Sequence, residues 1–163
     1  MRIIVVTLIL ISNALADDIY GIPKIIDGDT VYIDKYKIRL EGIDAPETKQ
    51  QCKKESLKIS SIVGFTFYKN YYCGKFSKEK LIAKINGSKI NCTLSSKDRY
   101  ERYIATCFKD EINLNQWMVR NGYAIAYRRY SKKYVSDEDF AKKNKLGLWR
   151  GKFLNPEKWR KLN

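Results

Sequence analysis

The sequence predicts an α+β protein in which a small antiparallel core, a five-stranded β-barrel, carries packed helices. Strand-like runs come first along the chain, and strand-like and helix-like runs are mixed after them. The length of 163 residues fits one domain with a real core rather than two. Neither an internal repeat nor a low-complexity linker interrupts this pattern.

The first 16 residues have the pattern of a signal peptide. Arg2 forms its positive end, residues 3–11 are apolar, and Ala14 and Ala16 supply the small residues of a cleavage site. The apolar stretch is too short to span a bilayer comfortably. We therefore expect a single mature domain over residues 17–163, exported to a periplasm or secreted, with no membrane span after signal removal.

The first predicted strand covers Ile19–Ile26, with an edge or bend at Pro23. A hairpin follows it. Its predicted strands are Thr30–Ile33 and Lys37–Gly42, joined by the short polar link 34–36.

Acidic residues flank this hairpin. Asp27 and Asp29 precede its first strand, and Asp44 and Glu47 follow its second. Antiparallel pairing brings these ends to the same edge. Because Arg39 lies in the second strand, the group combines oxygen ligands for a hard divalent cation with a phosphate-binding arginine. On spacing alone, the same residues also suit an ordinary turn and loop.

The remaining elements are mostly short and charged. They are a helix at Lys53–Ile62, a strand at Phe65–Tyr72, an amphipathic helix at Phe76–Ile85, paired strands at Lys89–Leu94 and Tyr103–Phe108 around a charged turn at 95–102, and helices at Leu114–Arg120 and Ser136–Lys145. Glycines at 87, 122 and 147 end the three later helices. The aromatic tail of Trp149, Phe153 and Trp159 is expected to pack on the core.

Composition favours a polyanionic partner. The chain has 32 Lys and Arg against 18 Asp and Glu, a formal net charge of +14, and 13% aromatic residues that can stack on bases. It has no histidine, which excludes an imidazole base, nucleophile or zinc ligand from this chain.

Four cysteines in an exported chain favour two disulfides, for which three pairings are possible. We prefer Cys92–Cys107, because these residues lie in two strand-like runs that flank one turn. The other pair is then Cys52–Cys73, which brackets a basic insertion. No CxxC occurs, so a redox motif or zinc ribbon is not indicated.

The acidic stretch resembles the staphylococcal nuclease (thermonuclease-like) family, through DGDTV at 27–31, the arginine-bearing strand and IDAPE at 43–47. The resemblance runs from about Ile25 to the final helix. It implies an OB-type barrel with about three α-helices. It also implies Ca²⁺ as cofactor, with Asp29 and Asp44 as carboxylate ligands and Ala45 as a backbone-carbonyl ligand.

By the same resemblance, Glu47 orients or deprotonates the attacking water, and Arg39 and Arg102 bind phosphate. Tyr100 and Tyr127 match positions that contact the nucleotide. One departure stands out, because the family usually reads D-[KR]-Y-G-R where this chain has Glu101 in the fourth place. A glutamate there costs roughly 1 kcal/mol if the left-handed conformation that glycine permits is kept, and otherwise the turn changes shape.

The implied function is a monomeric, calcium-dependent nuclease that hydrolyses DNA and RNA to 3′-phosphate products, without a stable protein partner. One alternative is a non-catalytic OB-type nucleic-acid-binding protein, although a pure binder has no reason to keep three carboxylates near phosphate. Another is a secreted basic protein that binds anionic lipid or cell-wall polymers.

Overall fold

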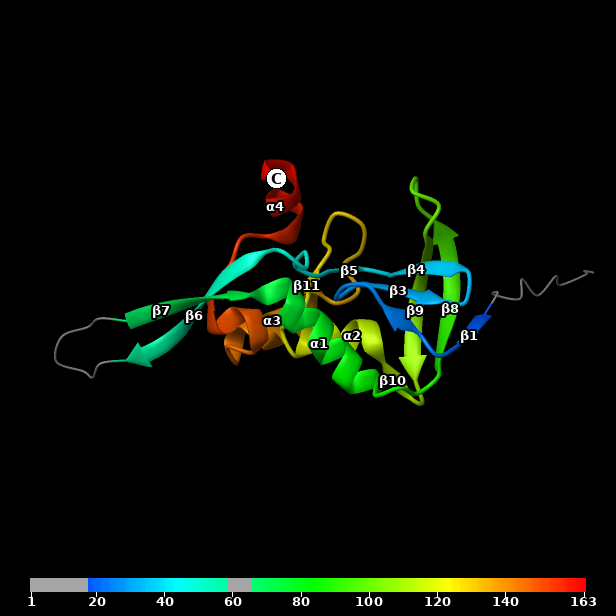
Figure 1. Cartoon of the computed structure of the whole chain (residues 1–163), viewed down its shortest axis with the longest axis horizontal. Coiled ribbons are helices and arrows are strands. Elements are labelled where there is room, and N and C mark those ends of the chain that lie inside the picture. The colour runs from blue at the N-terminus through cyan, green and yellow to red at the C-terminus, as the bar shows by residue number, and fades with distance from the viewer. Residues whose placement is uncertain (1–17, 59–65) are drawn as a thin grey trace, which may run out of the picture.

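The computed structural model describes residues 18–58 and 66–163 (Figure 1). The predicted signal peptide lies outside the described residues. Among the described helices, none combines the length and the apolar character needed to cross a membrane.

The described residues begin with a run of strands, and helices and strands are mixed after residue 72. The strands are β1 (Asp18–Gly21), β2 (Lys24–Ile25), β3 (Thr30–Ile33), β4 (Tyr36–Leu40), β5 (Ile43–Asp44), β6 (Gln51–Lys58), β7 (Thr66–Tyr72), β8 (Ile90–Lys97), β9 (Tyr103–Lys109), β10 (Ile112–Asn113), β11 (Ile125–Ala126) and β12 (Gly151–Lys152). The helices are α1 (Cys73–Ile85), α2 (Leu114–Arg120), α3 (Val135–Lys143) and α4 (Pro156–Leu162), with a 3₁₀ turn at Gly147–Arg150.

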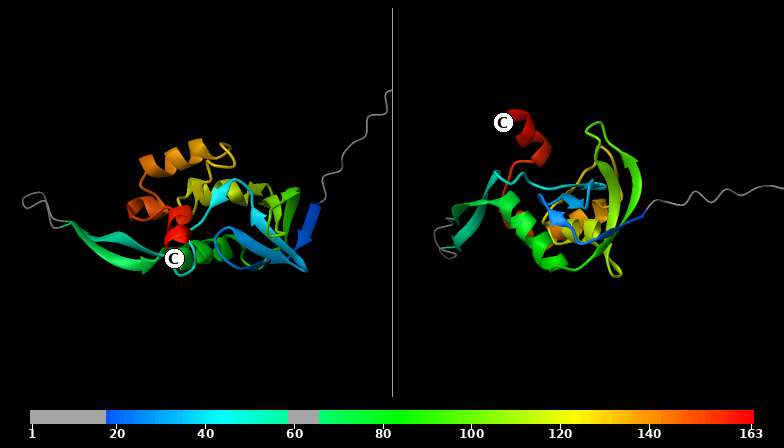
Figure 2. Two further views of the ribbon diagram at one scale, coloured as in Figure 1. Left: turned by 90° about the horizontal axis from the view of Figure 1, so that it is seen from above. Right: turned by 45° about the vertical axis from the view of Figure 1, so that its right-hand side comes forward.

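The main sheet is curled because the bent segment at residues 18–25 pairs with a different strand at each of its two ends. Its order is β1-β8-β9-β4-β3-β2, with β10 beside β9. β1 and β2 are the two parts of the predicted first strand, separated at Ile22-Pro23, and they pair with β8 and β3 respectively. The curvature is visible in Figure 2. These features confirm the predicted α+β class and OB-type fold.

The predicted hairpin is confirmed, with β4 one residue earlier at its start and two residues shorter at its end. Thr30 lies opposite Arg39 in the register, and a two-residue turn joins the strands. Asp34 in this turn has φ of 50°, a left-handed conformation that aspartate tolerates better than most residues. Because side chains alternate along β4, Ile38 and Leu40 are buried in the core while Arg39 points to the other face.

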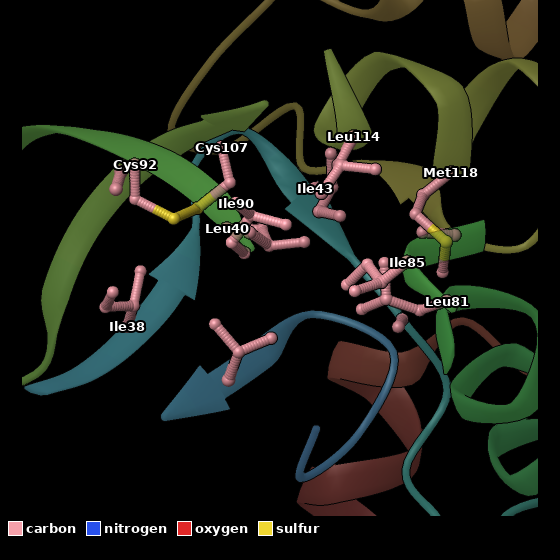
Figure 3. Packing of buried hydrophobic residues seen from close by; sticks show 14 of the residues in the cluster. Ile38, Leu40, Ile43, Leu81, Ile85, Ile90, Cys92, Cys107, Leu114 and Met118 are labelled. Carbon is pink, nitrogen blue, oxygen red and sulfur yellow. A yellow bond between two sulfur atoms is a disulfide. The ribbon is translucent and has the colours of Figure 1, made fainter. Parts of the chain in front are cut away.

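The core lies between the curled sheet and helices α1 and α2. Leu81 and Ile85 of α1 and Leu114 and Met118 of α2 are buried with strand residues in one cluster (Figure 3). Asn115, fully buried in α2, accepts a hydrogen bond from the backbone N–H of Cys107 and donates to the carbonyls of Glu41 and Ala105. This side chain therefore fixes α2 against the sheet.

Both predicted disulfides are present. Cys92 and Cys107 lie directly opposite each other in β8 and β9, as the hairpin prediction required. The second disulfide joins Cys52, the second residue of β6, to Cys73, the first residue of α1. In Figure 3 the Cys92–Cys107 bond lies among the labelled core side chains.

The helix predicted at Lys53–Ile62 is wrong over the residues described. Residues 51–58 form strand β6, which pairs with β7 and β12 in a separate three-stranded sheet. The β6–β7 ribbon projects from the body of the protein (Figure 1). The run KKESLK has one apolar residue and so no apolar face for a helix to bury, whereas its partner strand is aromatic and favours β pairing.

The C-terminal region holds a helix that the sequence analysis did not predict. Trp149 and Phe153 pack edge to face, with ring centroids 4.8 Å apart, and Phe153 packs on the Cys52–Cys73 cluster. This part of the predicted aromatic tail is confirmed. The chain then continues into α4, which contains the half-buried Trp159 and stands out from the body in Figure 1.

Candidate active site

Two buried carboxylates accept hydrogen bonds from the same guanidinium. Arg39 donates from Nη1 to Oδ1 of Asp29 (2.7 Å) and from Nη2 to Oδ1 of Asp44 (2.9 Å). Asp29 is 3% exposed and Asp44 is fully buried. The two ends of the hairpin therefore converge as their antiparallel pairing predicted.

The backbone around Asp29 fixes its carboxylate. The backbone N–H of Ala45 donates to Oδ2 (2.9 Å), and the Thr30 hydroxyl donates to Oδ1 (3.0 Å). The Asp29 carbonyl accepts from the N–H of Leu40 (2.8 Å). Asp44 is held in β5, where it lies opposite Ile125 of β11. Both carboxylates thus belong to paired backbone rather than to free loops.

Burial and neighbouring charges shift the pKa values of ionisable groups in the site. Although burial disfavours a charged guanidinium, the neighbouring Asp29 and Asp44 raise the pKa of Arg39 above its usual value. Burial raises the pKa of Asp44, and the hydrogen bond from Arg160 opposes this rise. Asp27 accepts the backbone N–H of Asp29 (3.1 Å), and burial together with the charge of Asp29 raises its pKa to about 7.

Glu47 lies on a loop held against the start of α1. Its carbonyl accepts from the N–H of Gln50 (2.7 Å), and its N–H donates to the Gln50 side chain (3.3 Å). Gly74 packs so closely on this loop that an added Cβ would lie 1.8 Å from the Glu47 carbonyl oxygen. The side chain of Glu47 is 34% exposed, so its carboxylate is accessible to water.

A second guanidinium reaches the same carboxylates from α4. Arg160 contacts Asp44 and Glu47 at 2.9–3.1 Å. Arg160 is not among the site residues predicted from the sequence. Asn155 followed by Pro156 is a recognisable helix start, and the Asn155 side chain indeed caps α4. No local pattern, however, links Arg160 to acids more than 110 positions earlier in the chain.

Arg102 and Tyr100 lie in the loop between β8 and β9, which forms one end of that hairpin (Figure 1). In the described part of the chain, the ion pair of Arg102 is with Asp98 (2.7 Å), and not with the carboxylates at Arg39. Tyr100 is 63% exposed and contacts the guanidinium groups of Arg99 and Arg102. Their predicted roles toward substrate stay predictions.

Tyr127, in contrast, lies beside the buried acids. The guanidinium carbon of Arg39 is 5.7 Å from the centroid of its ring. Its backbone N–H donates to the carbonyl of Gly42 (2.9 Å). Burial, followed by the charge of Asp44, raises the pKa of Tyr127. Tyr127 therefore lies next to Arg39, and its predicted contact with a nucleotide stays a prediction.

The glutamate in place of the usual glycine keeps the glycine conformation. Glu101 has φ of 58°, in the left-handed region, and its N–H donates to the carbonyl of Asp98 (3.0 Å). Its side chain is 83% exposed and pairs with Lys97 at 3.6 Å. The turn has thus kept its shape at a steric cost, and the acidic side chain points to solvent.

We expect Glu101→Gly to raise the free energy of unfolding by about 0.5–1 kcal/mol, because relief of the left-handed strain exceeds the added entropy of the unfolded chain. Urea denaturation measures this difference. Glu101→Gln is the matched control, since it removes the charge but keeps the strained backbone, and it should leave stability unchanged. A glycine variant less stable than the original protein would contradict this explanation.

The donor set fits a hard cation. Asp29, Asp44 and the carbonyl of Ala45 offer only oxygen, and both carboxylates already share one positively charged group. Among the described residues, no group of three or more Asp, Glu, His or Cys side chains is arranged to hold a metal. A cation here would therefore depend on the two carboxylates, a backbone carbonyl and water or phosphate oxygens.

Comparison with known proteins agrees with this geometry. The family described as "Staphylococcal nuclease homologue" matches residues 37–151. The chain is similar to "Succinoglycan biosynthesis protein ExoI" of Rhizobium meliloti, with 34% identity over 138 residues that cover 83% of this chain and 66% of that protein. It thus spans slightly less than two thirds of that relative.

Two further relatives carry nuclease names. An "Uncharacterized endonuclease" of Escherichia coli is 30% identical over 143 residues, covering 83% of this chain and 80% of that protein. A probable staphylococcal-like nuclease of Oryza sativa subsp. japonica is 28% identical over 138 residues, covering 82% of this chain and 30% of that protein. Together with the curled sheet and the converging acids, these matches show that the chain belongs to the staphylococcal nuclease family.

Proposed function

We propose that the mature protein is an exported, calcium-dependent nuclease that cuts both DNA and RNA with little sequence preference and leaves 3′-phosphate ends. The observation that most directly supports this proposal is the pair of buried carboxylates, Asp29 and Asp44, which both contact Arg39. The two disulfides fit an oxidising, exported location. The signal peptide over residues 1–16 and the monomeric state are part of the proposal.

In this proposal, Asp29, Asp44 and the Ala45 carbonyl would hold Ca²⁺, which when bound supplies positive charge to a phosphate oxygen. The Glu47 carboxylate accepts a hydrogen bond from the attacking water and orients it or takes its proton. No histidine of this chain competes for that role. The leaving group is the 5′ oxygen of the sugar, so the phosphate stays on the 3′ end.

Arginines stabilise the charge that develops on the phosphate oxygens. A guanidinium has five N–H groups, and the contacts of Arg39 with Asp29, Asp44 and the Ile43 carbonyl use three of them. The remaining two can donate to phosphate. Arg102 would supply a second guanidinium from the β8–β9 loop, after exchanging Asp98 for phosphate. Tyr100 and Tyr127 would contact the base or sugar.

An assay of the purified mature protein on DNA and on RNA tests the proposal. We expect degradation of both in calcium, loss of degradation in chelator, and products that a 3′-phosphatase can dephosphorylate. Binding without degradation at every calcium concentration would instead indicate a non-catalytic nucleic-acid-binding protein. Binding to anionic lipid or cell-wall polymers, with neither nucleic-acid degradation nor nucleic-acid binding, would indicate a secreted basic protein of another function.

A further inference from the structure

The C-terminal helix α4 places a guanidinium on two predicted functional carboxylates. Arg160 contacts Oδ1 of Asp44 through Nη1 (3.0 Å) and Oδ2 through Nη2 (3.1 Å), and its Nη1 also donates to Oε1 of Glu47 (2.9 Å). Oδ1 of Asp44 additionally accepts from Arg39 (2.9 Å). Both oxygens of Asp44 are therefore already bonded to positively charged groups.

The contacts of Arg160 and a bound divalent cation compete for the oxygens of Asp44. A cation held by Asp44 would take an oxygen that Arg160 now uses and would lie close to a guanidinium of the same sign. Like charges at such separations repel strongly where burial reduces screening by water. Glu47 is affected as well, because the carboxylate oxygen that accepts the hydrogen bond from Arg160 is less available to a water molecule.

The contacts of α4 suit an element that can leave. It has seven residues, too few for a helix that is stable by itself. Its other ion pairs are exposed, such as Glu157 with Arg129 (3.0 Å) and with Lys161 (3.2 Å). Leu154, two residues before α4, is anchored instead, since its carbonyl accepts a hydrogen bond from the buried Gln50 side chain (2.6 Å). A displacement of α4 would thus begin just after Leu154.

We propose that Arg160 is a positioning residue that competes with the divalent cation for Asp44 and Glu47. In the resting protein it neutralises and aligns these carboxylates, and it leaves them, together with α4, when the cation binds. This inference rests on the proposed calcium site. It assigns the C-terminal helix a role in setting the calcium concentration at which the enzyme becomes active.

Calcium titration calorimetry on the full mature chain, without nucleic acid, tests the competition. Arg160→Met keeps most of the side-chain volume but removes the charge, and we expect it to bind calcium at least about tenfold more tightly than the original protein. Arg160→Lys, which retains the charge, should stay close to the original affinity. Lys161→Met is the matched control, because it removes a positive charge from the same helix without touching Asp44 or Glu47.

A second readout follows the helix itself. Calcium should accelerate amide hydrogen exchange in residues 156–162 of the original protein, because α4 loses its ion pairs to the site. Unchanged or weaker calcium binding by Arg160→Met, or calcium-induced protection of α4, would overturn the competition while leaving the calcium site standing. Absence of calcium binding in both the original protein and Arg160→Met would overturn the calcium site and this inference together.

Discussion

Glu47→Gln is expected to slow hydrolysis of DNA by about 10²–10⁴-fold, the range for removal of a general base, with little change in nucleic-acid affinity. Glutamine keeps the size of the side chain and can still accept the hydrogen bond from Arg160, but it cannot take a proton. The loop that carries Glu47 is fixed by Gln50 and Gly74, so the substitution should leave the site in place. Single-turnover cleavage and separate binding measurements in calcium measure the two effects.

Glu41→Gln is the matched control for this variant. Glu41 accepts a hydrogen bond from Thr106 (3.2 Å) and lies between β4 and β5, close in sequence to Asp44 but without contact to Arg39 or Arg160 in the described residues. We expect it to cut normally. If Glu47→Gln cuts as fast as the original protein, Glu47 has no part in the chemistry.

The second large effect is expected at Arg39. Arg39→Met leaves Asp29 and Asp44 buried side by side without the group that joins them. Removing one partner of a buried ion pair costs about 3–5 kcal/mol, because the remaining charge stays desolvated. We therefore expect a loss of this size in the free energy of unfolding, measured by urea denaturation in chelator. Hydrolysis should fall as well, since the phosphate loses a donor.

Calcium should recover part of the stability that Arg39→Met loses, because a cation on the same carboxylates replaces the missing positive charge. Arg39→Lys distinguishes charge from geometry. A lysine keeps the charge but cannot donate to both carboxylates as the planar guanidinium does. The stability of Arg39→Lys should therefore lie between that of Arg39→Met and that of the original protein. Equal stability of Arg39→Met and the original protein in chelator would show that the two carboxylates do not depend on this guanidinium.

The hairpin and its acids were predictable because their positions follow from local rules. Antiparallel pairing fixes which chain ends meet, and the alternation of side chains places Arg39 on the face opposite Ile38 and Leu40. The disulfide between Cys92 and Cys107 follows from the pairing of another hairpin, β8 with β9. Each of these features depends on residues close together in the chain.

Two other features were not predicted in this way. The ribbon of β6 and β7 was misread over residues 53–58, because its charged first strand pairs with an aromatic strand and is clamped by the Cys52–Cys73 disulfide. Arg160 was missed because its partner Asp44 lies 116 positions away. No sequence pattern near Arg160 or near Asp44 indicates that these two residues are in contact.

The loop that contains Arg102 was predicted only in part. The family motif correctly indicated a left-handed residue, and Glu101 adopts that conformation. Arg102 pairs with Asp98, a contact that the motif does not indicate. The catalytic assignment of Arg102 therefore rests on the resemblance. Asp29 and Asp44, in contrast, both contact Arg39, and Glu47 shares Arg160 with Asp44.

The most direct test of this account is a calcium-binding isotherm of the mature protein compared with that of Asp44→Asn, with Asp110→Asn, an exposed residue of the turn between β9 and β10, as control. We predict one calcium ion per chain for the original protein and for Asp110→Asn, and binding weakened at least tenfold in Asp44→Asn. Calcium binding by Asp44→Asn as tight as that of the original protein would contradict the assignment of these carboxylates as its ligands.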